Sequence, residues 1–260
     1  MYEFNDLNPR SKPFGAPVGV EAVTYNGHQL DTEIVGFQTL TVEGREDFSR
    51  KINSVDASGD GTMYLSSKIE EREIAVNFYF EADTVQDYNA QMSKLKSILR
   101  EPNQKISFAD DTTYYFIGTP KLEVTAGTLT PTGKITFTLN DPFLYSEQTT
   151  QTVSGGAINV NNEELLYGTL PNTITVTMAA GVSSFSMTNG SKKFTTTSGV
   201  GEGDEIVIDF NKLTYVVNQV DQTANVSLQS NFGDFYIKNG DTINIPSASE
   251  ITLSYNVKTL

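Results

Sequence analysis

The stretch ITFTLNDPFLYSEQ, residues 135–148, begins as a strand and ends as something else. Ile135, Phe137 and Leu139 alternate with polar residues, which is the period-two pattern of a half-buried strand. Pro142 then interrupts the pattern, because proline has no N–H to give to a strand ladder. We interpret this stretch as the last strand of one domain followed by the exit of the chain, and not as a catalytic loop.

Two aromatic residues, Phe143 and Tyr145, follow the interruption. We expect both rings to pack against the core of the domain that the chain is leaving, with Phe143 buried. Residues 146–169 are rich in Gln, Thr, Ser, Gly and Asn, a composition typical of a linker. The sequence therefore predicts one domain over residues 1–145, a linker over 146–169, and a second domain over 170–260.

Upstream of this stretch the pattern is that of strands. AVTYNGHQL, residues 22–30, predicts a hairpin, with Asn26–Gly27 as the favoured two-residue turn. VGFQTLTVEG, residues 35–44, predicts another strand, and REIAVNFYF, residues 72–80, alternates most clearly. The first fifteen residues are polar and contain prolines, which indicates a surface arm and no signal peptide.

One helix interrupts these strands, over about residues 84–100. Its apolar residues recur at spacings of three and four, which places them on one face of a helix: Val85, Tyr88, Met92, Leu95 and Leu99. Thr84 and Asp87 form a plausible capping box, and Pro102 ends the helix. This apolar face can serve as core or as a subunit contact, and we favour core burial.

Downstream, short alternating segments follow at close spacing with turn residues between them, and no helical pattern interrupts them. These segments are residues 172–178, 183–189, 192–197, 205–210, 213–219, 224–229, 235–245 and 250–257. Such a series is typical of a β-sandwich. The predicted fold class is mainly β: a β-sandwich N-terminal domain with one inserted α-helix, followed by an all-β sandwich.

The composition limits the classes of function. The chain has no cysteine, which removes disulfides, thiolate metal sites and cysteine nucleophiles. Its net charge is −14, and both predicted domains are acidic, so specific nucleic-acid binding through phosphate contacts is disfavoured. There is no apolar run long enough to span a membrane. These properties fit a folded protein made in a reducing cytoplasm.

Two glycine-containing motifs suggest ligand sites and are better explained as turns. DASGDG, residues 56–61, resembles the first half of a calcium-binding loop, but the twelfth position is Ser67 where a bidentate glutamate is needed. GVGEGD, residues 199–204, lacks the Lys-Ser/Thr of a phosphate-binding loop and the strand–helix context of a dinucleotide fold. We interpret the second motif as the turn before a strand.

The remaining titratable residues do not build a catalytic site. His28 is the one histidine and lies beside the predicted turn, where an exposed position is the default. Glu70, Glu71 and Glu73 provide carboxylates for a glycosidase in principle, but a charge run beside a strand is usually solvated. The chain has no tryptophan to form a sugar platform. The sequence thus predicts no enzyme, no cofactor and no metal site.

The order of these segments resembles the distal tail protein family of long, non-contractile-tailed bacteriophages, the siphophage tail components. In that family an Arg-Glu strand precedes a helix, an F-x-D strand end is followed by a tyrosine, and an F-x-x-x-D-P-F/Y-x-Y motif closes the first domain. The matching positions here are Arg72, Glu73, Phe108, Asp110, Tyr115, Phe137, Asp141, Pro142, Phe143 and Tyr145. LPNTITV, GDEIVIDF and NGDTINIPS are similar to segments of the family's C-terminal galectin-like sandwich.

The resemblance implies a structural role in the virion tail tip. Six copies would close a homo-hexameric ring through their first domains and join the tail tube protein to the tail-tip hub protein. The outward C-terminal sandwiches would carry receptor-binding or baseplate proteins. DNA would pass through the channel without specific binding, and an acidic lumen would keep it from adhering.

A second hypothesis belongs to a different class of function. The C-terminal sandwich could act as a carbohydrate-binding adhesion module that holds a cell-wall glycan. The missing tryptophan favours protein contacts over glycan contacts, although tyrosine can also provide a flat ring.

Overall fold

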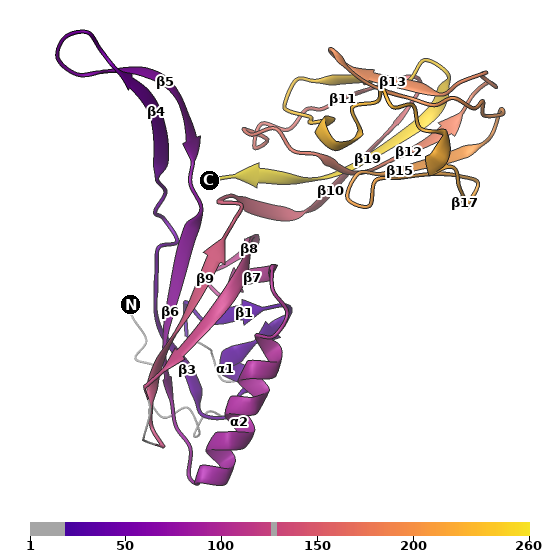
Figure 1. Ribbon diagram of the computed structural model, residues 1–260. Helices are drawn as coiled ribbons and strands as arrows, with labels where there is room; N and C mark the ends of the chain where they lie inside the picture. Colours follow the sequence, from indigo (N-terminus) through magenta and orange to yellow (C-terminus); the bar gives the residue numbers. More distant parts are fainter. Residues whose placement is uncertain (1–18, 126–128) are drawn as a thin grey trace. The chain divides into compact units, whose positions relative to one another are not determined.

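The computed structural model describes residues 19–125 and 129–260, and Figure 1 shows its ribbon. The chain divides into two compact units, one ending at Leu144 and the other beginning at Tyr145. The surface arm expected over the first fifteen residues lies outside the described residues. The two units are treated one after the other below.

The described residues of the N-terminal unit form nine strands and two helices. Their bounds are β1 Val23–Tyr25, β2 His28–Gln29, α1 Leu30–Glu33, β3 Phe37–Glu43, β4 Arg50–Asp56, β5 Thr62–Ile69, β6 Arg72–Phe80, α2 Val85–Ile98, β7 Gln104–Phe108, β8 Asp111–Val124 and β9 Thr132–Leu139. The long strand β8 pairs with β7 through its first part and with β9 through its last part. The antiparallel order is therefore β3-β6-β9-β8-β7-β1-β2.

The apolar faces of β6 and β9 carry the core of this unit. Ile74, Val76, Phe78 and Phe80 of β6 are fully buried, and the residues between them point to the other face. β9 places Phe137 opposite Ile74 in the antiparallel register. The alternation predicted for both strands is confirmed, because each strand has one face on the core and one face toward solvent.

The predicted hairpin at the start of the unit is confirmed. β1 pairs with β2 through Tyr25 and His28, and the two residues between them have positive φ, 50° at Asn26 and 80° at Gly27. Such a turn matches the right-handed twist of the strands that it joins.

The helix α2 begins and ends close to its predicted limits. The Thr84 hydroxyl accepts a hydrogen bond from the Asp87 backbone N–H at 3.1 Å, as the capping prediction requires. Met92, Leu95 and Ile98 are buried in the core. The helix thus uses its apolar face for the core, as we favoured, although Val85 at its first turn is 65% exposed.

Strands β4 and β5 form a separate two-stranded hairpin, which extends from the rest of the N-terminal unit in Figure 1. Every residue of β4 is exposed, as are six of the eight residues of β5. The turn between them contains the calcium-loop-like motif, and the Ala57 N–H donates to the Gly61 carbonyl at 3.2 Å. No alternating apolar pattern in the sequence marks these two strands.

The C-terminal unit consists of strands of two to twelve residues and two 3₁₀ turns. Their bounds are β10 Leu144–Ser154, β11 Ala157–Asn159, β12 Pro171–Met178, β13 Ser186–Asn189, β14 Lys192–Thr195, β15 Glu205–Asp209, β16 Thr214–Val217, β17 Val220–Asp221, η1 Thr223–Asn225, η2 Phe232–Asp234, β18 Thr242–Asn244 and β19 Ala248–Thr259. One sheet has the order β17-β16-β15-β12-β19-β10, and the other has the order β11-β18-β13-β14. The fold class is mainly β, as predicted.

The core of the C-terminal unit contains buried residues from both sheets. Ile174, Val176 and Ile251 come from the first sheet, and Met187 and Ile243 from the second. Alternate residues of each strand point inward, which is the arrangement of a β-sandwich.

Two segments of this unit differ from expectation. Strands β10 and β11 lie in the stretch that the sequence predicts as a linker, because the Thr/Gln-rich residues of β10 form a strand that pairs with β19. Thr150 and Thr152 contact Ser254 and Thr252 through their hydroxyls at 3.1 and 2.9 Å. Residues 224–229, predicted as a strand, instead contain the end of η1 and a turn that leaves Leu228 fully exposed.

Candidate functional site

Arg72, the first residue of β6, joins three parts of the N-terminal unit. Its side chain is only 6% exposed, and its Nη1 donates to the Pro142 carbonyl at 2.9 Å. Its Nη2 donates to the carbonyls of Gly44, at 3.4 Å, and Arg45. The guanidinium therefore fastens the start of β6 to the chain after β3 and to the chain that leaves β9.

The environment of Arg72 is apolar on one side. Its guanidinium carbon lies 5.4 Å from the centre of the Phe116 ring, a cation–π contact. Burial lowers the pKa of Arg72, and the nearby carboxylates of Glu46 and Asp47 oppose that change. Since arginine titrates far above neutral pH, the side chain remains a cation that donates to carbonyls.

A second arginine, Arg45, extends this cluster. Its Nη1 donates to Asp110 Oδ2 at 2.7 Å, and its guanidinium carbon lies 4.5 Å from the centre of the Phe108 ring. Because Arg72 binds the carbonyl of Arg45, the two arginines connect β6, the β7–β8 turn and the exit of β9. We call Arg45, Arg72, Phe108, Asp110 and Pro142 the arginine cluster.

The structure thus brings four of the ten residues predicted from the family motifs into one cluster: Arg72, Phe108, Asp110 and Pro142. Arg45, which is half-buried, was missed, since the segment between two strands carries no pattern that marks one arginine as packed against the unit. Gly44 precedes it with φ of +85°, and a Cβ placed there would lie 2.3 Å from the Glu73 carbonyl oxygen. Only glycine fits at this close approach.

Three other motif residues lie outside the cluster. Phe137 is fully buried and stacks on Tyr25, with ring centres 5.4 Å apart. Glu73 is exposed beside the cluster and pairs in the ladder with Thr138. Tyr115 is half-buried, and Lys105 Nζ lies 4.0 Å from the centre of its ring.

The last three motif residues shape the exit of the chain. Asp141 Oδ1 accepts a hydrogen bond from the Phe143 N–H at 3.3 Å, which forms an Asx turn around the buried Pro142. Phe143 is half-buried and not fully buried as we expected. Tyr145 belongs to the C-terminal unit, where Lys258 Nζ lies 5.6 Å from the centre of its ring. Leu144, which is half-buried, packs on the N-terminal core instead.

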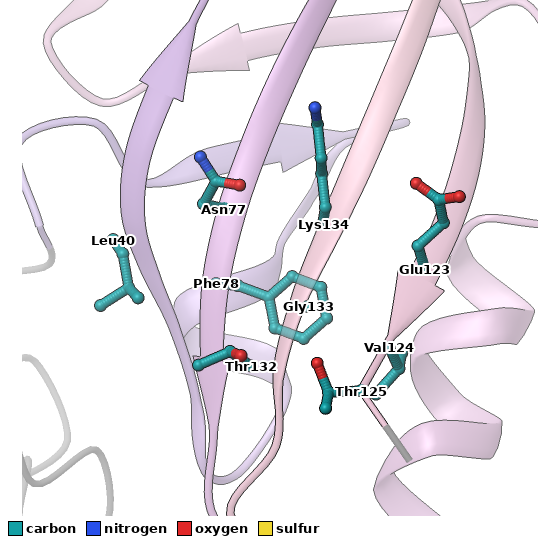
Figure 2. Close-up of a pocket in the computed structure, with 9 residues that line it drawn as sticks. All are labelled: Leu40, Asn77, Phe78, Glu123, Val124, Thr125, Thr132, Gly133 and Lys134. Atoms are coloured by element: carbon teal, nitrogen blue, oxygen red, sulfur yellow. The ribbon is translucent and has the colours of Figure 1, made fainter.

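The solvent-facing side of the N-terminal sheet has a hollow of about 400 Å³, shown in Figure 2. Gly133 lies in the lining of this hollow. A larger residue does not fit there, because a Cβ at position 133 would lie 2.3 Å from the ring of Phe78. Glu123 and Lys134 line the hollow, and Glu123 Oε1 also forms an ion pair with Lys121 Nζ at 2.9 Å. That pairing raises the pKa of Lys121 and lowers the pKa of Glu123.

The C-terminal unit has a second hollow, of about 330 Å³. Tyr236, Lys192 and Lys238 line it, and Lys192 Nζ lies 4.8 Å from the centre of the Tyr236 ring. Asn189 Nδ2 donates to Asp241 Oδ2 at 2.9 Å at its base. This hollow offers one aromatic ring and two amines.

The motifs that suggested chemistry form local structure. Asp204 Oδ2 accepts from the Gly201 N–H at 2.6 Å, which closes the predicted turn before β15 and lowers the pKa of Asp204. His28 is exposed, as expected, and its Nδ1 lies 2.9 Å from Glu33 Oε2. Among the described residues no group of three His, Cys, Asp or Glu side chains could hold a metal ion.

A membrane-crossing helix is likewise missing from the described part of the chain, where α2 is the longest helix.

Two family models match the chain in tandem. The model described as the phage tail protein RIFT-related domain matches residues 25–140, and the model described as the siphovirus-type tail component, C-terminal domain, matches residues 167–258. The two matches fall on the N-terminal and C-terminal units respectively. No curated protein matches the sequence significantly.

Solved structures with a similar fold come from bacteriophages. The Dit protein (gp 19.1) of phage SPP1, described as a paradigm of the hub adsorption apparatus in phages that infect Gram-positive bacteria, is 22% identical. The match has a TM-score of 0.75 and covers 93% of this chain and all of that chain. A chain of the phage P2 baseplate, in its activated conformation with Ca, is 10% identical with a TM-score of 0.50, over 84% of this chain and 90% of that chain.

Proposed function

Because this chain belongs to the siphophage distal tail protein family and is a structural component of the phage tail, we propose that six copies form a ring at the tail tip. The observation that carries the proposal is the tandem family match, in which both units correspond to tail components in one order along the chain. The ring would join the tail tube protein to the tail-tip hub protein, with receptor-binding or baseplate proteins attached to the C-terminal units. Such a protein would be made in the host cytoplasm and reside in the virion.

Strand edges that the N-terminal unit leaves without a strand partner support a ring. A ring needs a heterologous contact, in which one surface of each copy meets a different surface of the next copy. Strand β3 pairs only with β6 among the described strands, so its other edge has no strand partner in that part of the chain, although the Thr39 N–H donates to Asp31 and the Val42 N–H to Glu21. The β4–β5 hairpin provides two further strand edges.

The charge of the chain supports passage of DNA through such a ring. A net charge of −14 gives repulsion between protein and phosphate, which prevents adhesion of the genome to the channel. Replacing acidic lumen residues by lysine should slow DNA ejection from assembled virions in a fluorescence ejection assay. Unchanged ejection would count against this part of the proposal.

Mass measurement tests the ring directly. Native mass spectrometry of the purified chain, alone and after addition of the tail tube and hub proteins, should show a species of six copies. A chain that stays monomeric in all of these mixtures would overturn the proposal.

Glycan binding through the C-terminal unit is a second candidate, supported by the hollow beside Tyr236, whose side chain is 45% exposed. Tyrosine rings can stack on sugar rings, and the two lysines would favour an acidic glycan. Binding to a glycan array that is lost in Tyr236→Ala, and kept in the control Tyr64→Ala, would support this function. Equal glycan binding by both variants would exclude this hollow as the glycan-binding site.

A further inference from the structure

The β4–β5 hairpin exposes apolar side chains that its own unit does not cover. Ile52, Val55, Met63, Tyr64 and Leu65 are between 47% and 63% exposed. A two-stranded hairpin without a third strand or a packed face is at best marginally stable in water. The described part of the N-terminal unit does not bury these residues, so their side chains are available to a partner.

The antiparallel register distributes these side chains over both faces of the hairpin. Ser54 pairs with Tyr64, and Val55 pairs with Met63, so Tyr64 and Met63 point to opposite faces. A register shift at Leu65 accommodates one extra residue on β5. A partner must therefore surround the hairpin and not merely lie on one side of it.

The charge of the hairpin differs from that of the rest of the chain. Residues 50–69 contain three of the 18 basic residues and two of the 32 acidic residues. Lys51 and Lys68 lie directly opposite each other in the ladder, and both are exposed. Like charges at directly opposite positions repel each other, which an anionic surface would relieve.

We propose that the β4–β5 hairpin docks on a second copy of this chain, in a head-to-tail contact between neighbouring N-terminal units. This inference rests on the proposed ring and names the part of the chain that closes it. The charge complementarity favours a second copy as the partner, since outside the hairpin the chain is strongly acidic. The contact is heterologous, because the surface that receives the hairpin differs from the hairpin itself.

The first test removes the apolar side chains. The double variant Met63→Ser/Tyr64→Ser should weaken assembly at least tenfold, measured by mass photometry over a concentration series, with an unchanged thermal midpoint of the monomer. The matched control is Val220→Ser/Leu228→Ser, which removes two exposed apolar side chains from the C-terminal unit. Assembly that is equal in both variants and the unchanged chain would overturn the inference.

The second test reverses the charge. Lys51→Glu/Lys68→Glu should weaken assembly, and the weakening should shrink as salt is added, since salt screens charges at the surface. The control Lys96→Glu/Lys238→Glu makes the same change in charge at other exposed sites. Equal weakening by both variants would show only an effect of net charge and would overturn the role of the hairpin lysines.

The third test distinguishes two failures: the hairpin does not dock on a second copy, or the ring does not form at all. A photo-cross-linking amino acid at position 64 should join two copies of this chain in the assembled tail tip. A ring that forms while position 64 links only to a different tail protein would overturn the inference and leave the ring intact. A full chain that never self-associates would overturn both.

Discussion

Strands β5 and β6 are consecutive in the chain and are separated only by Glu70 and Glu71, and yet they differ in the burial of their side chains. Most of β5 is exposed, whereas β6 alternates between buried and outward residues and carries four fully buried apolar side chains. Both have antiparallel partners, with one register shift in the ladder of β5 and none in the ladder between β6 and β9. Backbone pairing alone therefore does not stabilise a sheet, because the burial of one apolar face supplies most of the free energy.

The largest expected effect on stability comes from a substitution in the core that β6 and β9 share. Phe137→Ala in β9 removes a fully buried ring that stacks on Tyr25, so the free energy of unfolding should fall by about 3–5 kcal/mol. Denaturant titration followed by circular dichroism measures it. Thr138→Ala, on the other face of the same strand, is the control and should change stability by less than about 1 kcal/mol.

The next effect lies where the chain leaves β3 toward the hairpin. Gly44→Ala should cost about 2–4 kcal/mol, since its φ is +85° and the new Cβ would meet the Glu73 carbonyl oxygen. Gly27→Ala has a similar φ of +80° but no atom within 4 Å of the new Cβ. A comparison of their thermal midpoints separates steric overlap from backbone strain, and equal losses would contradict the overlap.

Arg72→Met tests the point where the exposed β4–β5 hairpin meets the buried strand β6. The substitution keeps most of the side-chain volume and leaves buried carbonyls without their donor, so stability should fall by about 1–3 kcal/mol. The control is Arg100→Met, because Arg100 is exposed and pairs only at the surface with Glu101. If both variants unfold at the same denaturant concentration, the cluster contributes nothing to stability.

The smallest effect belongs to the hairpin itself. Tyr64→Ala should change the stability of the monomer by less than about 0.5 kcal/mol, because the ring is 62% exposed. Amide hydrogen exchange should be fast in β4 and β5 and slow in β6 and β9 of the monomer. Slow exchange throughout the hairpin of an isolated monomer would show that its own unit protects it.

Local patterns predicted much of this fold. The Asn26–Gly27 turn, the capping residue Thr84 and the alternation in β6 and β9 each depend on neighbours within a few residues, so the sequence alone reveals them. Polar strands were harder to predict, since β10 is polar enough to resemble a linker. The β4–β5 hairpin lacks a one-sided apolar pattern, because neither of its faces is buried within its unit.

The candidate site was only partly predictable. The family motifs pointed to Arg72, Phe108, Asp110 and Pro142, and the structure adds that these residues lie together. Arg45 and its contact with Asp110 span 65 residues of sequence, and no local pattern reports such a pair. Phe143 was expected to be buried, but the Asx turn at Asp141 places Pro142 in the buried position instead.

The hydrogen bond from Arg72 to the Pro142 carbonyl also has a mechanical consequence. A pull on the backbone beyond Leu144 is transmitted along the chain to Pro142, whose carbonyl Arg72 holds. The buried guanidinium meets that load before the ladder between β6 and β9 does, and it distributes the load to the segment after β3 through two further carbonyls. We therefore expect the hydrogen bonds of the arginine cluster to bear a pulling force on the C-terminal unit first. The hydrogen bonds between β9 and β6 would then stay intact under that force.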